Sequence, residues 1–157
     1  MTAEIPGQVL TFVLGTEHYG VDILRVQEIR GWAAITKIPH APAHVLGVLN
    51  LRGTIVPVVD LRMRFNLDHA AYTPTTVIIV LALVVSGSTR HVGVVVDAVS
   101  DVRDVNADDV RPAPELSGCT ATDYMIGILT SGTQMTMLLE IDRLIGGDIA
   151  CLSRSAA

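Results

Sequence analysis

The chain has 157 residues; half of them are hydrophobic, 17% are charged, and the net charge is −5. This composition excludes a disordered adaptor and predicts one folded domain, or two small subdomains that share a core. The negative charge argues against general nucleic-acid binding, which needs a concentrated basic face. The longest apolar run, Val77 to Val85, has nine residues, well short of the ~20 that a membrane-spanning helix needs.

Two features of the sequence bear on where the protein works. Its two cysteines, Cys119 and Cys151, do not have CxxC spacing, so a disulfide framework and a zinc site are not expected. The N-terminal MTAEIPGQ has neither a basic start nor an apolar core, so a signal peptide is not expected either. These features predict a cytoplasmic protein.

In the first half of the chain, short runs rich in valine and isoleucine recur between glycine, proline and asparagine residues, which is typical of β-strands. A hairpin is expected around GTEH, and Pro57 predicts an edge or a bulge in its strand. One helical turn is expected at residues 42–46 and a short helix at 61–65. The expected strands are residues 9–14, 19–23, 26–29, 35–38 and 54–59.

The second half of the chain has the same pattern. SGSTR is expected to be a turn, SGT is expected to close a second hairpin, and residues 66–76 are the best candidate for a crossing between two halves. A short helix is expected within residues 142–152. Strands this frequent, without a long 3.6-residue period, predict a barrel or a sandwich. The expected strands are residues 75–84, 91–96, 125–130 and 134–141.

Residue types that carry chemistry do not form a recognisable catalytic or metal motif. His40 and His44 have i,i+4 spacing, but Pro39 and Pro42 argue against one helix that presents both rings. Cys119 has no fixed basic neighbour, and no phosphate-binding or GxSxG motif occurs. An acidic segment lacks the glycine and the closing glutamate of a calcium loop; it contains Asp101, Asp104, Asp108 and Asp109. We therefore expect no catalytic residue, no metal and no cofactor.

Glu28 and Arg52 each interrupt an apolar strand-like segment, VQEI and NLRG. An arginine in such a place either finds a partner or keeps its guanidinium in water while its stem lies on apolar surface. One interpretation is a salt bridge, or two solvent-facing side chains, of the kind that contributes little stability. The other interpretation is a pair that orients a binding partner. The residues alone leave both open.

Five segments together match one family. They are LTFVLGTEHYGVDI, VQEIRG, GVLNLRGTIVPVVDLR, GVVVDAVSDV and RPAPE, in the family's order and at its distances. On these motifs the chain resembles the CheW-like family of bacterial chemotaxis coupling proteins, from about residue 9 to residue 145. The resemblance implies a single domain at residues 9–147, made of two β-barrel subdomains, with terminal extensions at 1–8 and 148–157.

The resemblance also implies a fold and a role. The fold is mainly β, with two interlocked five-stranded SH3-like β-barrels and a short C-terminal helix. The role is that of a non-catalytic adaptor that couples transmembrane chemoreceptors to the histidine kinase CheA in signalling arrays. The implied partners are the regulatory domain of CheA, the cytoplasmic tip of the receptors and, in rings, further copies of the adaptor. Such a protein meets the inner face of the membrane only through the receptors.

The family's motifs place two binding surfaces on this sequence. A receptor helix is expected to dock in an apolar groove at the junction of the barrels, where Gly47 lets two backbones approach and Arg52, beside Glu28, orients the helix. The receptor-binding residues are Val26, Glu28, Ile29, Gly47, Arg52 and Val102. The residues of the kinase or ring interface are Arg111, Glu115 and Leu116. The sequence departs from the family at SGSTRH, which is longer than the usual turn, and at Leu116, where an aromatic residue is common.

Two alternatives stay open at this point. A CheW-like scaffold of another kinase pathway, for example one that controls pili or surface behaviour, would carry the same motifs. A small-molecule-binding or enzymatic barrel would instead show a deep polar pocket with converging titratable groups.

Overall fold

The computed structural model describes residues 5–33, 35–65, 73–85, 87–112 and 125–145. Within them lie eleven strands, one α-helix and two 3₁₀ helices, and residues 141–145 are also helical. The elements of the first half are β1 (Gln8–Leu14), β2 (Glu17–Asp22), η1 (Ile23–Arg25), β3 (Val26–Gly31), β4 (Val45–Leu51), β5 (Thr54–Asp60) and α1 (Leu61–Arg64). Those of the second half are β6 (Val77–Val85), β7 (Ser88–Val96), β8 (Ala98–Asp104), η2 (Ala107–Asp109), β9 (Val110–Arg111), β10 (Met125–Ser131) and β11 (Gln134–Leu139).

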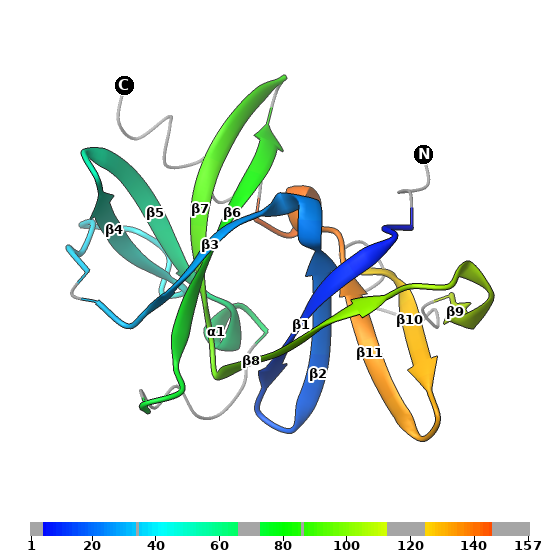
Figure 1. The fold of residues 1–157 in the computed structure, drawn as a ribbon. Coiled ribbons are helices and arrows are strands. Elements are labelled where there is room, and N and C mark those ends of the chain that lie inside the picture. The colour runs from blue at the N-terminus through cyan, green and yellow to red at the C-terminus, as the bar shows by residue number, and fades with distance from the viewer. Residues whose placement is uncertain (1–4, 34, 66–72, 86, 113–124, 146–157) are drawn as a thin grey trace.

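The strands form two sheets whose chain paths are interlocked (Figure 1). Sheet A has six strands in the order β8-β1-β2-β11-β10-β9, and sheet B has five in the order β3-β6-β7-β5-β4. The chain begins in sheet A, leaves it after β2 to build all of sheet B, and returns to sheet A at β8. Sheet A is therefore completed only when strands from both ends of the chain meet.

The long apolar segment of the chain is β6, and both of its faces are buried over residues 78–81. Ile78 and Val80 belong to a core within sheet B, whereas Ile79, Leu81 and Leu83 belong to a larger core shared by the two sheets. This alternation follows from the two-residue period of a strand, and it explains why the segment reads as a continuous apolar run instead of an alternating one. A third, smaller core lies within sheet A, so the shared core joins two barrels that each have an interior.

Aromatic stacking in the shared core centres on Tyr19. Its ring lies between those of Phe12 and Phe65, with centroid distances of 6.0 and 5.4 Å. Burial raises the pKa of the Tyr19 phenol, and the nearby charge of Glu17 adds to this effect, because both disfavour the phenolate. The three rings tie β1 and β2 of sheet A to the end of α1.

A buried charge network lies at the start of α1. Asp60 caps the helix, since its Oδ1 accepts a hydrogen bond of 3.0 Å from the backbone N–H of Arg62. The fully buried guanidinium of Arg62 donates to both carboxylate oxygens of Asp60 and to Oδ1 of Asp97. The hydrogen bond to Asp60 is the main cause that raises the pKa of Arg62. Such pairing is required because an unpaired buried charge is very costly.

Most of the predicted elements are confirmed, including both hairpins, the short helix after residue 60 and the long apolar strand. The fold class is also confirmed as mainly β in two interlocked barrel-like sheets. Sheet A differs from the expected five strands because the two-residue strand β9 adds a sixth. The C-terminal helix begins at residue 141; the expected residues beyond 145 lie outside the described part of the chain.

Three local predictions are wrong for reasons of tertiary pairing. Residues 35–38 are not a strand, because only Thr36 pairs, in an isolated bridge to Val48. Residues 42–46 do not form a helix: the Val45 N–H donates to the Pro42 oxygen at 2.9 Å in a single turn, and Val45 already pairs with β5 as the start of β4. SGSTR is not a long turn, because Val85 already pairs with Ser88 and the strands continue on both sides.

A further expectation concerned the connection between the two halves of the chain, and another concerned Pro57. Residues 66–76 were predicted as the crossing between halves, but β5 and β6 belong to the same sheet, and residues 66–72 lie outside the described residues. The crossings are at η1, between β2 and β3, and at Asp97, between β7 and β8. Pro57 was predicted to mark an edge or a bulge. Its strand β5 is not an edge strand, because it lies between β4 and β7, but the ladder of β5 with β4 has a bulge between Val45 and Gly47, opposite Val59 and Val58. The missing N–H of Pro57 is tolerated since the β7 ladder begins only at Val58.

Candidate functional site

Arg52 lies in the tight turn between β4 and β5. Leu51 pairs with Thr54, so the turn has two central residues, Arg52 at φ +50° and Gly53 at φ +86°. Two positive φ angles define a type I′ turn, whose first central position favours Asn, Asp or Gly. The side chain of Asn50 accepts a hydrogen bond of 2.9 Å from the Gly53 N–H and supports the turn. An arginine is thus held in a left-handed conformation that L-residues with long side chains seldom adopt.

The structure brings Glu28 and Arg52 together. Nη2 of Arg52 lies 2.6 Å from Oε2 of Glu28, and Nη1 of Arg30 lies 3.7 Å from the other carboxylate oxygen. The Arg52 side chain is 74% exposed, whereas that of Glu28 is 26% exposed. Glu28 on β3 therefore holds a guanidinium that remains open to solvent. The salt bridge, one of the two interpretations of the sequence, exists, and most of the Arg52 side chain remains exposed.

Val26 and Ile29 lie on β3 with Glu28, but they are not equivalent. Val26 is half-buried and packs on the shared core, while Ile29 is 46% exposed. Adjacent strand residues point to opposite faces, so Ile29 lies on the other face of β3 from Glu28 and its ion pair. Trp32, just after β3, is also exposed and was not singled out from the sequence.

Gly47 lies where two backbones approach closely. It has φ +147°, and a Cβ at this position would overlap the carbonyl oxygen of Thr36 and lie 2.9 Å from Cα of Lys37. Hydrogen bonds of 3.0 and 2.8 Å join the backbones of Thr36 and Val48 beside it. The contact of Gly47 is therefore with its own chain, and any side chain there would displace the segment before β4.

Val102 is the only one of the six groove residues on sheet A. It lies on β8 opposite Leu10 of β1, and it is 48% exposed. This ladder between β1 and β8 contains a bulge between Leu10 and Phe12. At the bulge, the Thr11 hydroxyl donates to the backbone oxygen of Asp101 at 2.9 Å. In Figure 1, β3 and β8 both run across the near side of the molecule. The predicted groove residues thus come from both sheets.

Of the three predicted kinase or ring residues, the structure describes one. Arg111 is exposed on β9, the edge strand of sheet A, and pairs with Ile128 of β10. Glu115 and Leu116 lie outside the described residues. The main chain of β9 lies close to Gly127, where a Cβ would approach the backbone oxygen of Arg111 to 2.8 Å.

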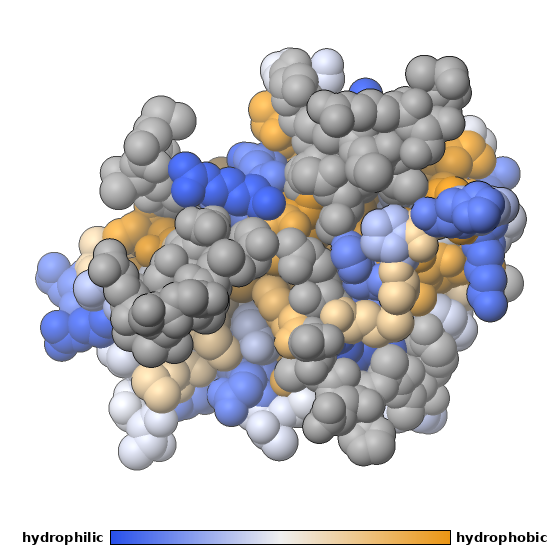
Figure 2. All heavy atoms as spheres, turned by 180° about the vertical axis from the view of Figure 1, so that it is seen from behind, coloured by the Kyte–Doolittle hydropathy of each residue, from blue (hydrophilic) through white to orange (hydrophobic). Residues whose placement is uncertain are grey.

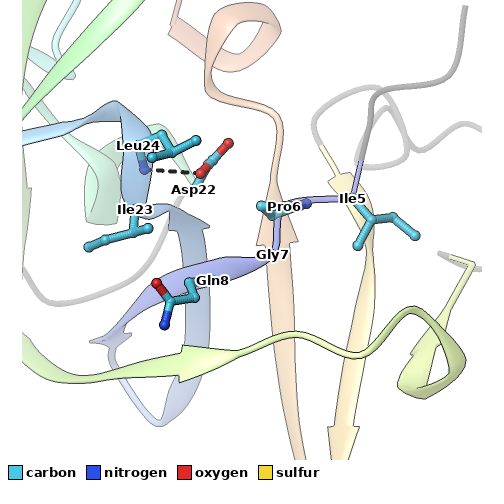
Figure 3. A pocket seen from close by; sticks show the side chains of 7 residues that line it. All are labelled: Ile5, Pro6, Gly7, Gln8, Asp22, Ile23 and Leu24. Carbon is cyan, nitrogen blue, oxygen red and sulfur yellow. Dashed lines mark hydrogen bonds between the residues drawn. The ribbon is translucent and has the colours of Figure 1, made fainter.

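A shallow pocket beside the first crossing was not foreseen (Figure 3). Ile5 to Gln8 form one side and Asp22 to Leu24 the other. The side chain of Asp22 accepts a hydrogen bond of 3.0 Å from the Leu24 N–H and caps η1, as the dashed line in Figure 3 shows. Leu24 is strongly exposed. Single exposed apolar residues are common on protein surfaces, so this leucine could not be recognised from the sequence.

The described residues contain little that resembles a catalytic or metal centre. Among them, no three His, Cys, Asp or Glu side chains are grouped to hold a metal ion. No helix in the described part of the chain has the length and apolarity to cross a membrane. On the back face shown in Figure 2, hydrophobic surface occurs in separate places between hydrophilic and grey atoms.

Comparison with known proteins identifies the family. The model of the CheW-like domain matches residues 8–148. The chain belongs to the CheW-like family. The chemotaxis protein CheW of Klebsiella aerogenes is 43% identical over 158 aligned positions, which cover 100% of this chain and 93% of that protein. CheW of Rhizobium meliloti is 39% identical over 135 positions, covering 86% and 84% of the two chains.

A solved structure of a CheW-like protein has the same fold. The scaffolding protein TtCheW of Thermoanaerobacter tengcongensis superposes with a TM-score of 0.78 at 32% identity, covering 90% of this chain and 93% of that one. This family of chemotaxis scaffold proteins accounts for the interlocked sheets and for the motifs around Glu28 and Arg52.

Proposed function

We propose that this protein is a non-catalytic adaptor that couples the cytoplasmic tips of chemoreceptors to the histidine kinase CheA. Its membership of a family of chemotaxis scaffold proteins supports this role. It would act at the inner face of the membrane, held there through the receptors. The signal would pass as a change in the populations of kinase states and not as chemistry in this chain.

The observation that carries the proposal is the conformation of Arg52. Selection for stability alone favours Asn or Gly at the first central position of a type I′ turn. An arginine in the left-handed region is a local cost, and such costs cluster where a residue has a function. Glu28 holds the guanidinium in place, so less side-chain freedom is lost on binding. Its planar fork is suited to orient a helix through carboxylate or carbonyl groups.

The remaining receptor-binding residues supply apolar surface and shape. Ile29 on sheet B and Val102 on sheet A are each about half exposed, so each barrel offers one apolar residue to a receptor helix. Because Ile29 and Glu28 lie on opposite faces of β3, the helix would run along the edge of this outer strand to contact both Ile29 and Arg52. Val26 supports β3 from the shared core, and Gly47 acts indirectly by allowing the segment before β4 to pack. The proposed receptor surface is the set Val26, Glu28, Ile29, Gly47, Arg52 and Val102.

We assign the kinase or ring interface to the end of sheet A around β9. Arg111 is exposed on this edge strand, and Glu115 and Leu116 follow it in the chain. The partner is the regulatory domain of CheA or a neighbouring copy of this protein. Repeated weak contacts in an array would gain strength from effective concentration.

The test is co-sedimentation of this protein with a receptor signalling fragment and CheA, scored by kinase activity. Arg52→Glu should lose receptor binding while its circular dichroism spectrum and melting remain those of the wild type. Gln134→Glu adds negative charge beside the β10–β11 turn of sheet A and serves as the control, with binding unchanged. If Arg52→Glu stays folded and binds the receptor fragment as the wild type does, the groove assignment is wrong. Leu116→Asp should weaken CheA association and spare the receptor.

A further inference from the structure

The chain crosses between the two sheets twice, and an ion-pair network lies at each crossing. The first crossing is η1, which joins β2 of sheet A to β3 of sheet B. The second is Asp97, which joins β7 of sheet B to β8 of sheet A. Both strands that follow a crossing carry proposed receptor-binding residues. The orientation of each such strand therefore depends on how its crossing is held.

The network at the second crossing has a buried centre: the side chains of Arg62 and Asp60 are 0% exposed, while that of Asp97 is 31% exposed. Asp97 accepts hydrogen bonds from Arg62 at 2.9 Å and from the Gly15 N–H, in the β1–β2 turn, at 2.7 Å. Arg62 is fully buried and also paired with Asp60. This network joins the end of β5, the start of β8 and the β1–β2 turn. Breaking it would leave a buried charge uncompensated, so it is a permanent part of the fold.

The network at the first crossing is different, because neither side chain of its ion pair is fully buried. Arg25 donates to both carboxylate oxygens of Asp142, at 3.2 and 2.8 Å, and to the backbone oxygen of Ala82 at 3.2 Å. Asp142 also accepts from the Val84 N–H at 2.9 Å. The two side chains of this ion pair are 30% and 24% exposed. The network joins η1, the end of β6 and the helical residues 141–145.

Arg25 directly precedes β3, the strand that carries three of the proposed receptor-binding residues. β3 begins at Val26, the next residue, and Glu28 and Ile29 follow within three positions. β3 pairs with β6 from Val26 onward, but the bulge between Val26 and Glu28 leaves Gln27 outside the ladder, so the ladder holds the start of this strand less firmly. A bidentate guanidinium–carboxylate contact fixes orientation as well as distance.

From these observations we infer that Arg25 and Asp142 are positioning residues: their ion pair fastens the start of β3 to the C-terminal helix and thereby sets the spacing of the receptor-binding surface. This inference rests on the proposed receptor role of β3 and β8. Because the pair is part-exposed, its loss changes the relation between the sheets without unfolding either core. The network around the buried Arg62 holds the second crossing, so the change is confined to the first.

The geometric part of the test measures the distance between the barrels. Spin labels on Thr89 of β7 and Gln134 of β11, in protein whose Cys119 and Cys151 are serines, report this distance by pulsed electron resonance. Asp142→Asn should broaden or shift the distance distribution, whereas Asp108→Asn, an exposed change in η2, should not. An Asp142→Asn distribution that matches the wild type overturns the inference.

The binding part uses a receptor signalling fragment and a mutant cycle. Arg25→Met and Asp142→Asn should each weaken the affinity by about fivefold or more, and the double variant should be no weaker than either single variant. Arg25→Lys, which keeps the charge and loses the fork, should fall between Arg25→Met and the wild type. Additive effects in the double variant overturn the inference. Unchanged binding by folded Arg52→Glu would instead count against the proposed receptor role, while the measured distances would still decide the positioning of the barrels.

Discussion

Replacing Arg52 by asparagine should leave the protein as stable as before or more stable, while receptor binding is lost. The reason is that the type I′ turn between β4 and β5 forces a positive φ of 50° on this residue, and asparagine adopts that region readily. The guanidinium that the proposed function needs is removed at the same time. Stability and binding should therefore move in opposite directions, or stability should not move at all.

The magnitude follows from two opposing terms. The left-handed conformation costs an ordinary L-residue roughly 1–2 kcal/mol, of which asparagine recovers about 1 kcal/mol. The lost ion pair with Glu28 is worth about 0.2–1 kcal/mol, because the Arg52 side chain is 74% exposed. The net change in the free energy of unfolding is then between about zero and +1 kcal/mol. For a chain of this size, 1 kcal/mol raises Tm by about 2–4 °C.

Urea unfolding and thermal melting measure the stability, and titration with a receptor signalling fragment measures the binding. Glu28→Gln is the matched control, because it removes the ion pair and leaves the turn unchanged. It should cost no more than about 1 kcal/mol. If Arg52→Asn lowers the free energy of unfolding by more than about 1 kcal/mol, the pair is a main structural contact and the functional interpretation of the turn is refuted.

Three further predictions test the fold around the site. Gly47→Ala should lower the free energy of unfolding by more than about 2 kcal/mol, because its Cβ would overlap the Thr36 carbonyl oxygen; a loss below about 0.5 kcal/mol in urea unfolding would contradict the close approach. Arg62→Met should cost about 3–5 kcal/mol in the same assay, and a neutral result would show that the buried network is not essential. The pKa of Tyr19 is raised, mainly by burial, so the stability it contributes is complete below about pH 10 and is lost as pH rises through the folded-state pKa. Tyr19→Phe should therefore lose less stability between pH 9 and pH 11 than the wild type, and equal losses would exclude this cause.

The parts of the fold that were predictable are those with a strong local pattern. The apolar run of β6 and the turn residues of the two hairpins are recognisable within a few positions of sequence. The wrong predictions are those in which a distant strand decides the conformation. Thr36 is held by a single bridge to Val48, and Val45 becomes a strand residue because β5 pairs with it. The local sequence pattern of neither segment indicates which distant strand it pairs with.

The candidate site shows the same division. Glu28 and Arg52 stand out in the sequence because each is a charge within an apolar segment, and their contact confirms that they belong together. The left-handed turn at Arg52 was not predicted, since it depends on the register of β4 with β5. Arg25 and Asp142 are separated by 117 positions, so only the folded chain reveals that they form a pair.

The interlocked path of the chain also has a consequence for its synthesis. The β1–β2 hairpin is made first, yet its two neighbours in sheet A, β8 and β11, are made only after all of sheet B. A ribosome adds about 5–20 residues per second, so the 117 positions between Arg25 and Asp142 correspond to roughly 6 to 23 seconds. The hairpin has two unpaired edges until β8 emerges and one until β11 emerges, and a lone hairpin is only marginally stable. Open edges of this kind pair readily with other chains, so the nascent protein is most exposed to aggregation before its last strands emerge.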